Sequence, residues 1–283
     1  MKTIYNILLV MVAALALSAC QKESAGGMDE EVAVCITAAI PDAAFRKAAG
    51  DGACIDKVYY EVWSKDFGKV VADGSQDVDG CTASVDLKLI RDKEYEIILW
   101  AQCSTCQAYS WETLKEINIS YKEAGQEYAQ GNAEERDAFY AVSKIRTYGM
   151  VDKYISLTRP FSQLNFFSEH LDFYQFEGYE IQIQGLSDVF DTIAGEGKSG
   201  NGQTCTFKAD AQFTSGQSEK DGKMYDHLAM NYIMVPGQIG NIDMNVTFSA
   251  SKDGNMISGN HEMSNVTVKA NERVNIYGEL IIK

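Results

Sequence analysis

Two cysteines separated by two residues form the most chemically suggestive motif in the sequence, Cys103-Ser104-Thr105-Cys106. A C-x-x-C pair acts as a redox couple when it opens a helix, because the helix N-terminus lowers the pKa of the thiol. The residues that follow, QAYSWETLKEI, lack the pattern of a strongly amphipathic helix, and no second pair of Cys or His ligands has zinc-site spacing. We therefore predict a loop pair in which Cys103 and Cys106 are oxidised, either with each other or with other cysteines.

The other residue types that carry out catalysis match no enzyme motif that we tested. The sequence contains no H-E-x-x-H, no G-x-S-x-G and no P-loop, and its three histidines are scattered: His170, His227 and His261. Glycosidases need two carboxylates about 5–10 Å apart in a cleft, and forty acidic residues make chance candidates common. We predict no enzyme, and an enzyme would need polar residues that converge in a pocket.

Metal and cofactor sites are also not expected. Asp73, Asp77 and Asp79 offer oxygen ligands for calcium, but their spacing lacks the complete EF-hand pattern. We therefore predict neither a metal nor a cofactor.

The secondary structure that must position these residues is indicated by apolar residues at every second position. Alternating apolar residues, β-branched and aromatic types among them, recur in short segments bounded by Gly, Asp, Asn or Ser: VAVCI (32–36), KVYYEVW (57–63), EYEIILW (94–100), YEIQIQ (179–184), DMNVTF (243–248) and VNIYGELIIK (274–283). This pattern is typical of antiparallel strands with one buried face. It predicts an all-β protein made of β-sandwiches. A single short helix is expected at 133–145, where Phe139, Val142 and Ile145 share one face.

The N-terminus predicts export and a lipid anchor. Ile7 to Leu17 is an apolar run of eleven residues, too short for the roughly 20 that a membrane span needs but suited to a signal peptide. Leu17-Ser18-Ala19-Cys20 resembles the lipobox of bacterial lipoproteins, which predicts a signal peptide at 1–19 and a lipid on Cys20. The alternative is a plain secreted protein with a chance cysteine.

The residues after Cys20 refine this prediction. Gln21 in place of Asp favours the outer membrane, by similarity to lipoprotein sorting rules. Residues 20–31 are polar and contain glycine, which is typical of a flexible tether between the lipid and a folded body.

Length and composition limit the remaining possibilities. The 264 residues after the signal (283 − 19) predict two domains, which we place at 32–152 and 153–283. A net charge of −15 and the lack of a basic run exclude a nucleic-acid partner. Export permits disulfides, but six cysteines besides Cys20 allow fifteen full pairings, among which the sequence does not choose: Cys35, Cys54, Cys81, Cys103, Cys106 and Cys205. The alternative for several of them is a buried thiol without a disulfide.

Several segments together resemble the fimbrillin-like lipoproteins of anaerobic Gram-negative bacteria. They are the lipobox ending at Cys20, then VAVCITAAIP, FRKAAGDG, KVYYEVW, EIILWAQ, RDAFY, ISLTRPFSQLNFF and VNIYGELII. The resemblance implies two tandem β-sandwiches of transthyretin-like or immunoglobulin-like, Greek-key topology. It also implies a cell-surface, lipid-anchored pilus component (anchor, tip or subunit) or an adhesin that contacts other fimbrial subunits or host proteins.

The same resemblance gives Arg46 a role. In such pilus subunits an Arg-specific protease removes the first strand, and the exposed groove accepts a strand from the next subunit. Arg46 occupies the matching place after the first predicted strand, and the alternative is an ordinary basic loop residue. The sequence stops one residue after Ile282, without a surplus terminal strand, so an anchor, a tip or a stand-alone surface protein is expected as much as a shaft subunit.

A glycan-binding lipoprotein for nutrient capture is the alternative function. The chain has fifteen Tyr and three Trp, and exposed aromatic rings can stack on sugars, although most aromatic residues of a sandwich lie in its core. Separately, Asp191-Thr192-Ile193 resembles the O-glycosylation site of some exported bacterial proteins, with Thr192 as the acceptor.

Overall fold

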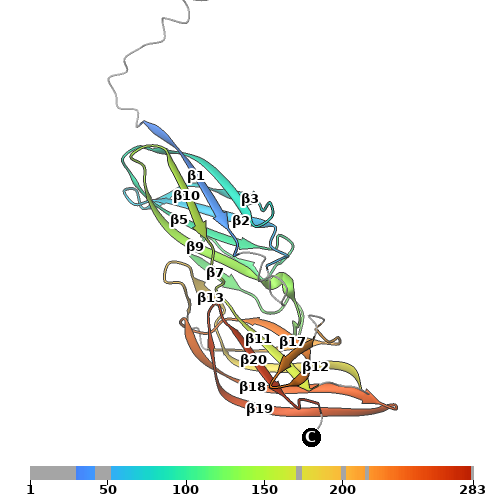
Figure 1. The fold of residues 1–283 in the computed structure, drawn as a ribbon. Helices are drawn as coiled ribbons and strands as arrows, with labels where there is room; N and C mark the ends of the chain where they lie inside the picture. Colours follow the sequence, from blue (N-terminus) through green and yellow to red (C-terminus); the bar gives the residue numbers. More distant parts are fainter. Residues whose placement is uncertain (1–29, 42–51, 170–173, 199–201, 214–216, 282–283) are drawn as a thin grey trace, which may run out of the picture. The chain divides into compact units, whose positions relative to one another are not determined.

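The computed structural model describes residues 30–41, 52–169, 174–198, 202–213 and 217–281. Nearly all regular structure in these ranges is β-strand, and the exception is one turn of 3-10 helix, η2 (Glu134–Arg136) (Figure 1). The predicted all-β, sandwich-type fold is therefore confirmed. In the part of the chain that the structure describes, no helix has the length and apolar character needed to cross a bilayer.

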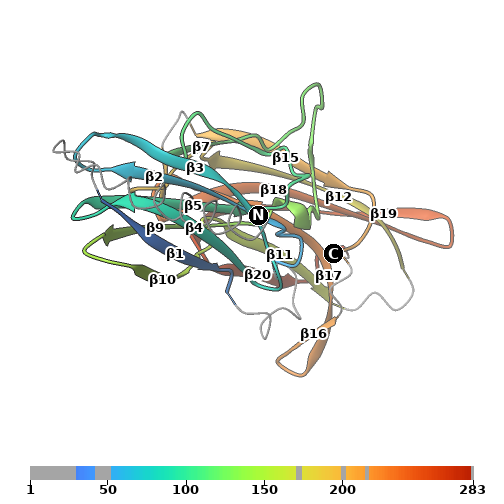
Figure 2. The ribbon, with the colours of Figure 1, turned by 90° about the horizontal axis from the view of Figure 1, so that it is seen from above.

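Seven of the described strands form a first sandwich of two facing sheets. One sheet has the order β10 (Val151–Ser156), β1 (Glu31–Ala39), β4 (Thr82–Ile90), and the other has the order β3 (Lys69–Asp77), β2 (Lys57–Ser64), β5 (Glu94–Gln102), β9 (Ala138–Arg146). Figure 2 separates the two layers, with β2 and β3 on one side and β1 and β10 on the other. Val34 and Ile36 from one sheet and Ile97 from the other are fully buried in the shared core, as their alternating positions predict.

Nine further strands form a second sandwich in the same way. Its sheets have the orders β16 (Gln217–Lys220), β17 (Lys223–Ile233), β11 (Ser162–Glu169), β20 (Arg273–Gly278) and β19 (Asn255–Lys269), β18 (Ile239–Lys252), β12 (Gln175–Leu186), β15 (Gln203–Ala209), β8 (Ala129–Gln130). The rings of Phe166 on β11 and Phe248 on β18 meet across the core with centroids 5.6 Å apart. Burial of large apolar side chains from both layers is the main source of stability in such a sandwich.

A small fifth sheet covers part of the outer face of sheet β3-β2-β5-β9. Its order is β14 (Glu196–Lys198), β13 (Val189–Asp191), β7 (Glu116–Ile119), β6 (Tyr109–Ser110). Phe190 of β13 contacts Trp100 of β5 and Tyr140 of β9, with ring centroids 6.1 and 4.6 Å apart. Because of this cover, Ile97 and Ile98 on opposite faces of β5 are both fully buried, which explains the continuous apolar run in EIILW.

Strand direction differs from the antiparallel expectation at three places. β1 runs parallel to β10, β11 runs parallel to β20, and β15 runs parallel to β8, whereas pairs such as β2 with β5 and β12 with β18 are antiparallel. In the first pair the first described strand of the first sandwich lies beside its last strand, and in the second pair β11 lies beside β20, the last strand of the second sandwich. Parallel neighbours need a long crossover connection, which the local alternation of a strand does not reveal.

The predicted helix at 133–145 is wrong. Only Glu134–Arg136 is helical, as η2, and β9 (Ala138–Arg146) follows it directly. In β9 Phe139 and Ile145 are buried toward the first core, with Ala141 between them on the same face. Positions 139 and 145 are six residues apart and therefore also share one face of a strand, so the spacing that we interpreted as helical fits both structures. The segment forms a strand because it pairs with β5 along its whole length.

The boundary between the two predicted domains remains a prediction. Contacts between residues group Val32–Lys283 into one compact unit. The predicted boundary after Asp152 falls inside β10, which pairs with β1, so a division after β10 would keep that pair together.

A buried ion pair stands where the chain passes from β10 to β11. Arg159 donates two hydrogen bonds to the carboxylate of Asp137, at 2.6 and 2.7 Å, and only 1% of the Asp137 side chain is exposed. The Arg159 guanidinium also lies over the rings of Phe139 and Tyr232, 4.8 and 5.8 Å from their centroids. Phe139 belongs to the first core and Tyr232 to the second, so Arg159 contacts both.

We predict that Arg159→Met lowers the free energy of unfolding by about 3–5 kcal/mol, because it leaves the buried Asp137 carboxylate without its partner. Urea unfolding followed by circular dichroism measures the loss. Lys223→Met is the matched control, since it breaks the exposed pair with Glu169 and should cost no more than about 1 kcal/mol. Equal losses in the two variants would contradict the role given to Arg159.

Candidate functional site

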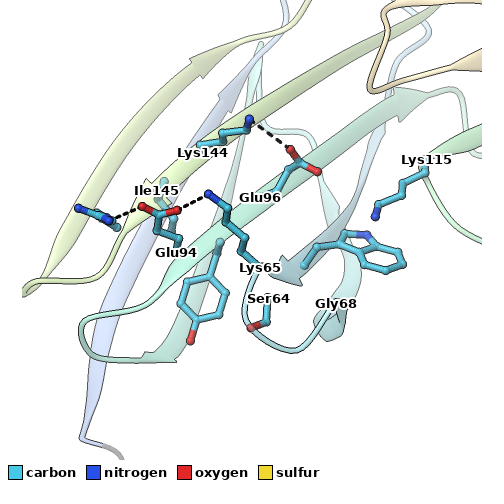
Figure 3. A pocket seen from close by; sticks show the side chains of 11 residues that line it. Ser64, Lys65, Gly68, Glu94, Glu96, Lys115, Lys144 and Ile145 are labelled. Atoms are coloured by element: carbon cyan, nitrogen blue, oxygen red, sulfur yellow. Dashed lines mark hydrogen bonds and ion pairs between the residues drawn. The ribbon is translucent and has the colours of Figure 1, made fainter.

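A groove of about 520 Å³ lies on the uncovered part of the outer face of sheet β3-β2-β5-β9. The small fifth sheet covers this face at Ile98 and Trp100, whereas the end of the strands nearest Glu94 stays open. The groove is lined by Trp63, Ser64, Lys65, Gly68, Glu94, Tyr95, Glu96, Lys115, Lys144, Ile145 and Arg146 (Figure 3).

Strand register brings opposite charges together on the floor of the groove. Glu94 lies opposite Arg146 on β9, and Glu96 lies opposite Lys144 on the same strand. Both glutamates alternate with Tyr95 and Ile97, so they point away from the first core. Cross-strand pairs of opposite charge stabilise a sheet modestly and fix the positions of their side chains.

Cations outnumber carboxylates in the groove. Lys65 and Arg146 both bind the Glu94 carboxylate, and the hydrogen bond from Lys65 and the charge of Arg146 lower the pKa of Glu94. Lys144 and Lys115 bring the lining to four cations against two carboxylates, a local charge of +2 (4 − 2) on a chain of −15. The groove is thus a basic spot on an acidic protein.

Trp63 is the more exposed of the two aromatic residues that line the groove, since Tyr95 is buried, and two neighbours hold Trp63 in place. Its indole Nε1 donates to Glu61 Oε2 at 2.9 Å, and Glu61 Oε1 accepts from the backbone N–H of Leu114 at 2.9 Å. Lys115 places its Nζ 3.4 Å from the centroid of the Trp63 ring. The buried Glu61 therefore fixes both the indole and the segment that carries Lys115.

This arrangement suits binding rather than bond making. A half-buried, oriented indole beside lysine and arginine can hold a ligand that has both a flat apolar face and a negative charge. Neither histidine nor cysteine occurs among the described residues that line the groove, and its one serine, Ser64, is 1% exposed. The two lining carboxylates are engaged by cations.

Two of the predicted site residues lie outside the described residues. These are Cys20, the predicted lipid attachment point, and Arg46, the predicted processing site. Both remain predictions.

Cys103 and Cys106 lie in a tight turn and are both buried thiols in the structure. The N–H of Cys106 donates to the carbonyl of Cys103, while Asp56 accepts hydrogen bonds from the backbone and hydroxyl of Ser104 at 2.7 and 2.6 Å. Burial raises the pKa of the Cys106 thiol, which makes it a poor nucleophile at neutral pH. The disulfide between them stays a prediction.

Thr192 lies in the interior of the folded protein. Its side chain is 1% exposed, and its hydroxyl donates to the carbonyl of Leu114 at 2.7 Å. A sugar on this oxygen would have to displace that hydrogen bond and the surrounding packing. O-glycosylation of Thr192 stays a prediction, and the folded state keeps the acceptor atom from solvent.

The described histidines have structural contacts. His227 stacks on Phe167, with centroids 4.2 Å apart, and burial lowers the pKa of His227 to about 4, so its ring is neutral at pH 7. His261 on β19 forms a hydrogen bond with the carbonyl of Leu280. His170 lies outside the described residues.

Two of the three acidic residues that we considered for calcium lie on an edge strand, and the third, Asp79, lies beyond its end. Asp73 and Asp77 lie on β3, and Asp77 pairs with Lys57 at 3.1 Å. Across the described ranges, no group of three His, Cys, Asp or Glu side chains is placed to hold a metal ion. Residues 195–200 match the spacing G-x-G-x-x-G, but Glu196–Lys198 form strand β14 where a dinucleotide-binding turn would begin a helix.

Sequence reasoning missed the groove, although its signal was present. Glu94 and Glu96 alternate with apolar residues in EYEIILW, and Lys144 and Arg146 alternate in the same way in SKIR. We interpreted the polar positions as ordinary solvent-facing residues. Only the pairing of β5 with β9 shows that they face one another.

Several solved structures of known proteins are similar to this structure. A candidate cell adhesion protein from Bacteroides eggerthii is 10% identical, with a TM-score of 0.51 and coverage of 89% of this chain and 88% of that one. A candidate adhesin from Bacteroides thetaiotaomicron is 10% identical, with a TM-score of 0.50 and coverage of 90% and 95%. The fimbrial anchor protein Mfa2 from Porphyromonas gingivalis is 10% identical, with a TM-score of 0.44 and coverage of 87% and 90%.

At these identities the likeness concerns the fold, and it agrees with the all-β architecture that the fimbrillin-like resemblance implied. No match was found among curated proteins. The sequence itself matches a family of unknown function, DUF6562, over residues 26–283. The chain is therefore a member of the DUF6562 family, and it has the β-sandwich fold of candidate adhesion proteins of Bacteroides.

Proposed function

We propose that this protein is a fimbrillin-like cell-surface lipoprotein that works through protein contacts, as a pilus component (anchor, tip or subunit) or as an adhesin. A lipid on Cys20 would hold it in the outer membrane. Chemistry on a substrate is not part of the proposal. Its support includes the adhesion roles named for two proteins of the same fold.

The observation that carries the proposal is the position of β1. This strand lies between β10 and β4, with six register pairs to β10 from Val34↔Val151 to Ala39↔Ser156. Its alternate side chains, Val34, Ile36 and Ala38, are fully buried in the first core. Loss of β1 would leave two strand edges and an apolar slot that a strand of matching alternation from another subunit could fill.

The lipid anchor is the first test. We predict that cells expressing the full chain incorporate labelled palmitate into it and keep it in the membrane fraction, whereas Cys20→Ser abolishes labelling and releases the protein. The reason is that several acyl chains anchor stably while the apolar run alone is too short to span. Cys54→Ser, at an exposed cysteine, is the control and should label normally. An unlabelled wild-type chain would contradict the anchor.

Processing at Arg46 is the second test. We predict that an Arg-specific protease cuts the purified chain first at Arg46, the position that the fimbrillin-like resemblance indicates. The other five arginines are held in structure: Arg146 and Arg273 lie in strands, Arg136 lies in η2, Arg159 forms the buried ion pair, and Arg91 donates to the carbonyl of Tyr148. The cut separates β1 from the rest of the chain covalently, and strand exchange between molecules should then give oligomers in size-exclusion chromatography. Arg46→Gln is the control and should stay intact and monomeric. Chains that are cut at Arg46 and remain monomeric would exclude assembly by strand addition.

A second candidate function is glycan binding, and the oriented Trp63 in its basic groove favours it. The indole supplies a stacking surface, and Lys65, Lys115, Lys144 and Arg146 suit sugars that carry carboxylate groups. Such a ligand could belong to a nutrient polysaccharide or to a host surface.

We predict that a glycan array shows binding to uronic acid-containing oligosaccharides and that Trp63→Ala weakens it about tenfold, the size of one lost aromatic contact. Tyr128→Ala is the matched control. Lys208 places its Nζ 3.4 Å from the centroid of the Tyr128 ring, as Lys115 does for Trp63, but Tyr128 lies next to β8 of the second sandwich and does not line the groove. The control should bind like the wild type. An array without binding would remove this candidate.

A further inference from the structure

Three turns meet at one end of the first sandwich, and we call this the tether end. They are residues 65–68 between β2 and β3, 91–93 between β4 and β5, and 147–150 between β9 and β10. The register pairs Ser64 with Tyr95, Tyr95 with Ile145, and Val34 with Val151. The last pair places the start of β1, where the described part of the chain begins, at the same end (Figure 1).

Contacts between the turns make the tether end a rigid platform. Lys93 pairs with Asp66 at 2.9 Å, which joins the first two turns. Arg91 Nη1 donates to the carbonyl of Tyr148 at 3.2 Å, and the N–H of Asp92 donates to the carbonyl of Thr147 at 2.8 Å. These bonds join the second turn to the third.

The tips of the outer turns expose large apolar side chains. Phe67 is 54% exposed, Tyr148 is 62% exposed and Met150 is 83% exposed. Cations accompany both rings: Lys69 lies 5.8 Å from the centroid of Phe67, and Arg146 lies 5.5 Å from that of Tyr148. Aromatic rings flanked by lysine and arginine are typical of protein surfaces at the interface between lipid and water.

The length of chain between the lipid and the tether end keeps this surface near the membrane. The chain from Cys20 to Val32 spans twelve residue-to-residue steps (32 − 20). Fully extended they reach about 40 Å, and as a flexible chain they average about 20 Å. A surface held within that distance meets the bilayer at a high effective concentration, so a contact too weak to act alone becomes populated.

We infer that the tether end docks on the lipid headgroup layer of the membrane that holds Cys20, with Phe67, Tyr148 and Met150 in contact with lipid. The inference rests on the proposed lipid anchor and adds a second point of attachment, which fixes how the first sandwich stands on the membrane. The three turns carry Asp66 and Asp92 besides Lys65, Arg91 and Lys93, so their net charge is only +1 (3 − 2). Apolar contact rather than net charge therefore holds the surface to the lipid.

Methionine oxidation tests the docking with controls inside the same chain. The mature chain, with a hexahistidine tag in place of the lipid, is bound to phosphatidylcholine vesicles that contain a nickel-chelating lipid and is then treated briefly with hydrogen peroxide. Mass spectrometry of the tryptic peptides compares each methionine with the same protein free in solution. Met150 should oxidise about fivefold more slowly on the vesicles, whereas the exposed Met224 and Met256 of the second sandwich should keep their rates.

The double variant Phe67→Ser/Tyr148→Ser tests whether Met150 is protected by docking or only because the nearby vesicle blocks access of peroxide. Both side chains are exposed, so the variant should fold normally, and the protection of Met150 should fall below about twofold. Protection of Met150 in the wild type should persist at about 0.5 M salt, where charge attraction is screened.

Unchanged oxidation of Met150, equal protection of Met256, full protection in the double variant, or loss of protection in salt would each overturn the inference. Because the tag replaces the lipid, failure here leaves the palmitate-labelling test of Cys20 unaffected. Conversely, an unlabelled Cys20 would refute the anchor without altering the oxidation result.

Discussion

Sheet β3-β2-β5-β9 must bury apolar side chains on both of its faces, and most of the structure follows from this constraint. On one face Ile97 and Leu99 of β5 complete the first core with β1 and β4. On the other face Ile98 and Trp100 are equally buried and need a second cover. The small sheet β14-β13-β7-β6 supplies that cover through Phe190, and it is drawn from two segments far apart in the chain. Packing on β5 therefore brings residues 109–119 and 189–198 into contact with the first sandwich.

The cover is incomplete, and the composition of the strands changes where it ends. Along β5 the outward residues change from Ile98 and Trp100 under the cover to Glu94 and Glu96 in the open groove. Glu61 marks the border, since it is buried and accepts hydrogen bonds from Trp63 on the open side and from Leu114 on the covered side. A buried carboxylate is costly unless it is hydrogen-bonded, so these two bonds couple the indole of the groove to the covering segment. The groove is thus a consequence of how the sheet is covered, not a separate structure.

The sequence allowed the fold class to be predicted because strands with one buried face carry a local signal. Large apolar residues stand at every second position of VAVCI and DMNVTF, and both segments are strands in the structure. The helix prediction for residues 133–145 was wrong because the apolar spacing of Phe139, Val142 and Ile145 occurs in helices and in strands. Only the pairing of this segment with β5 shows that it is a strand. Parallel pairing of β1 with β10, and of β11 with β20, joins residues more than a hundred positions apart, which no local pattern records. The groove escaped prediction for the same reason, since its residues come from three strands and from the segment of Lys115.

Some buried polar side chains tie distant segments of the chain together. Tyr121 donates to the carbonyl of Ser187 and accepts from the N–H of Met234, and burial raises the pKa of Tyr121 far above its ordinary value. His227 is held neutral between aromatic rings. Hydrogen-bonded and tightly packed groups of this kind rigidify a sandwich. By contrast, the described residues of the first sandwich leave an oriented indole at Trp63 and large apolar side chains at Phe67, Tyr148 and Met150 accessible at the surface. Rigid packing inside the sandwiches therefore holds these surface groups in fixed positions, which lowers the entropy that they lose when a partner contacts them.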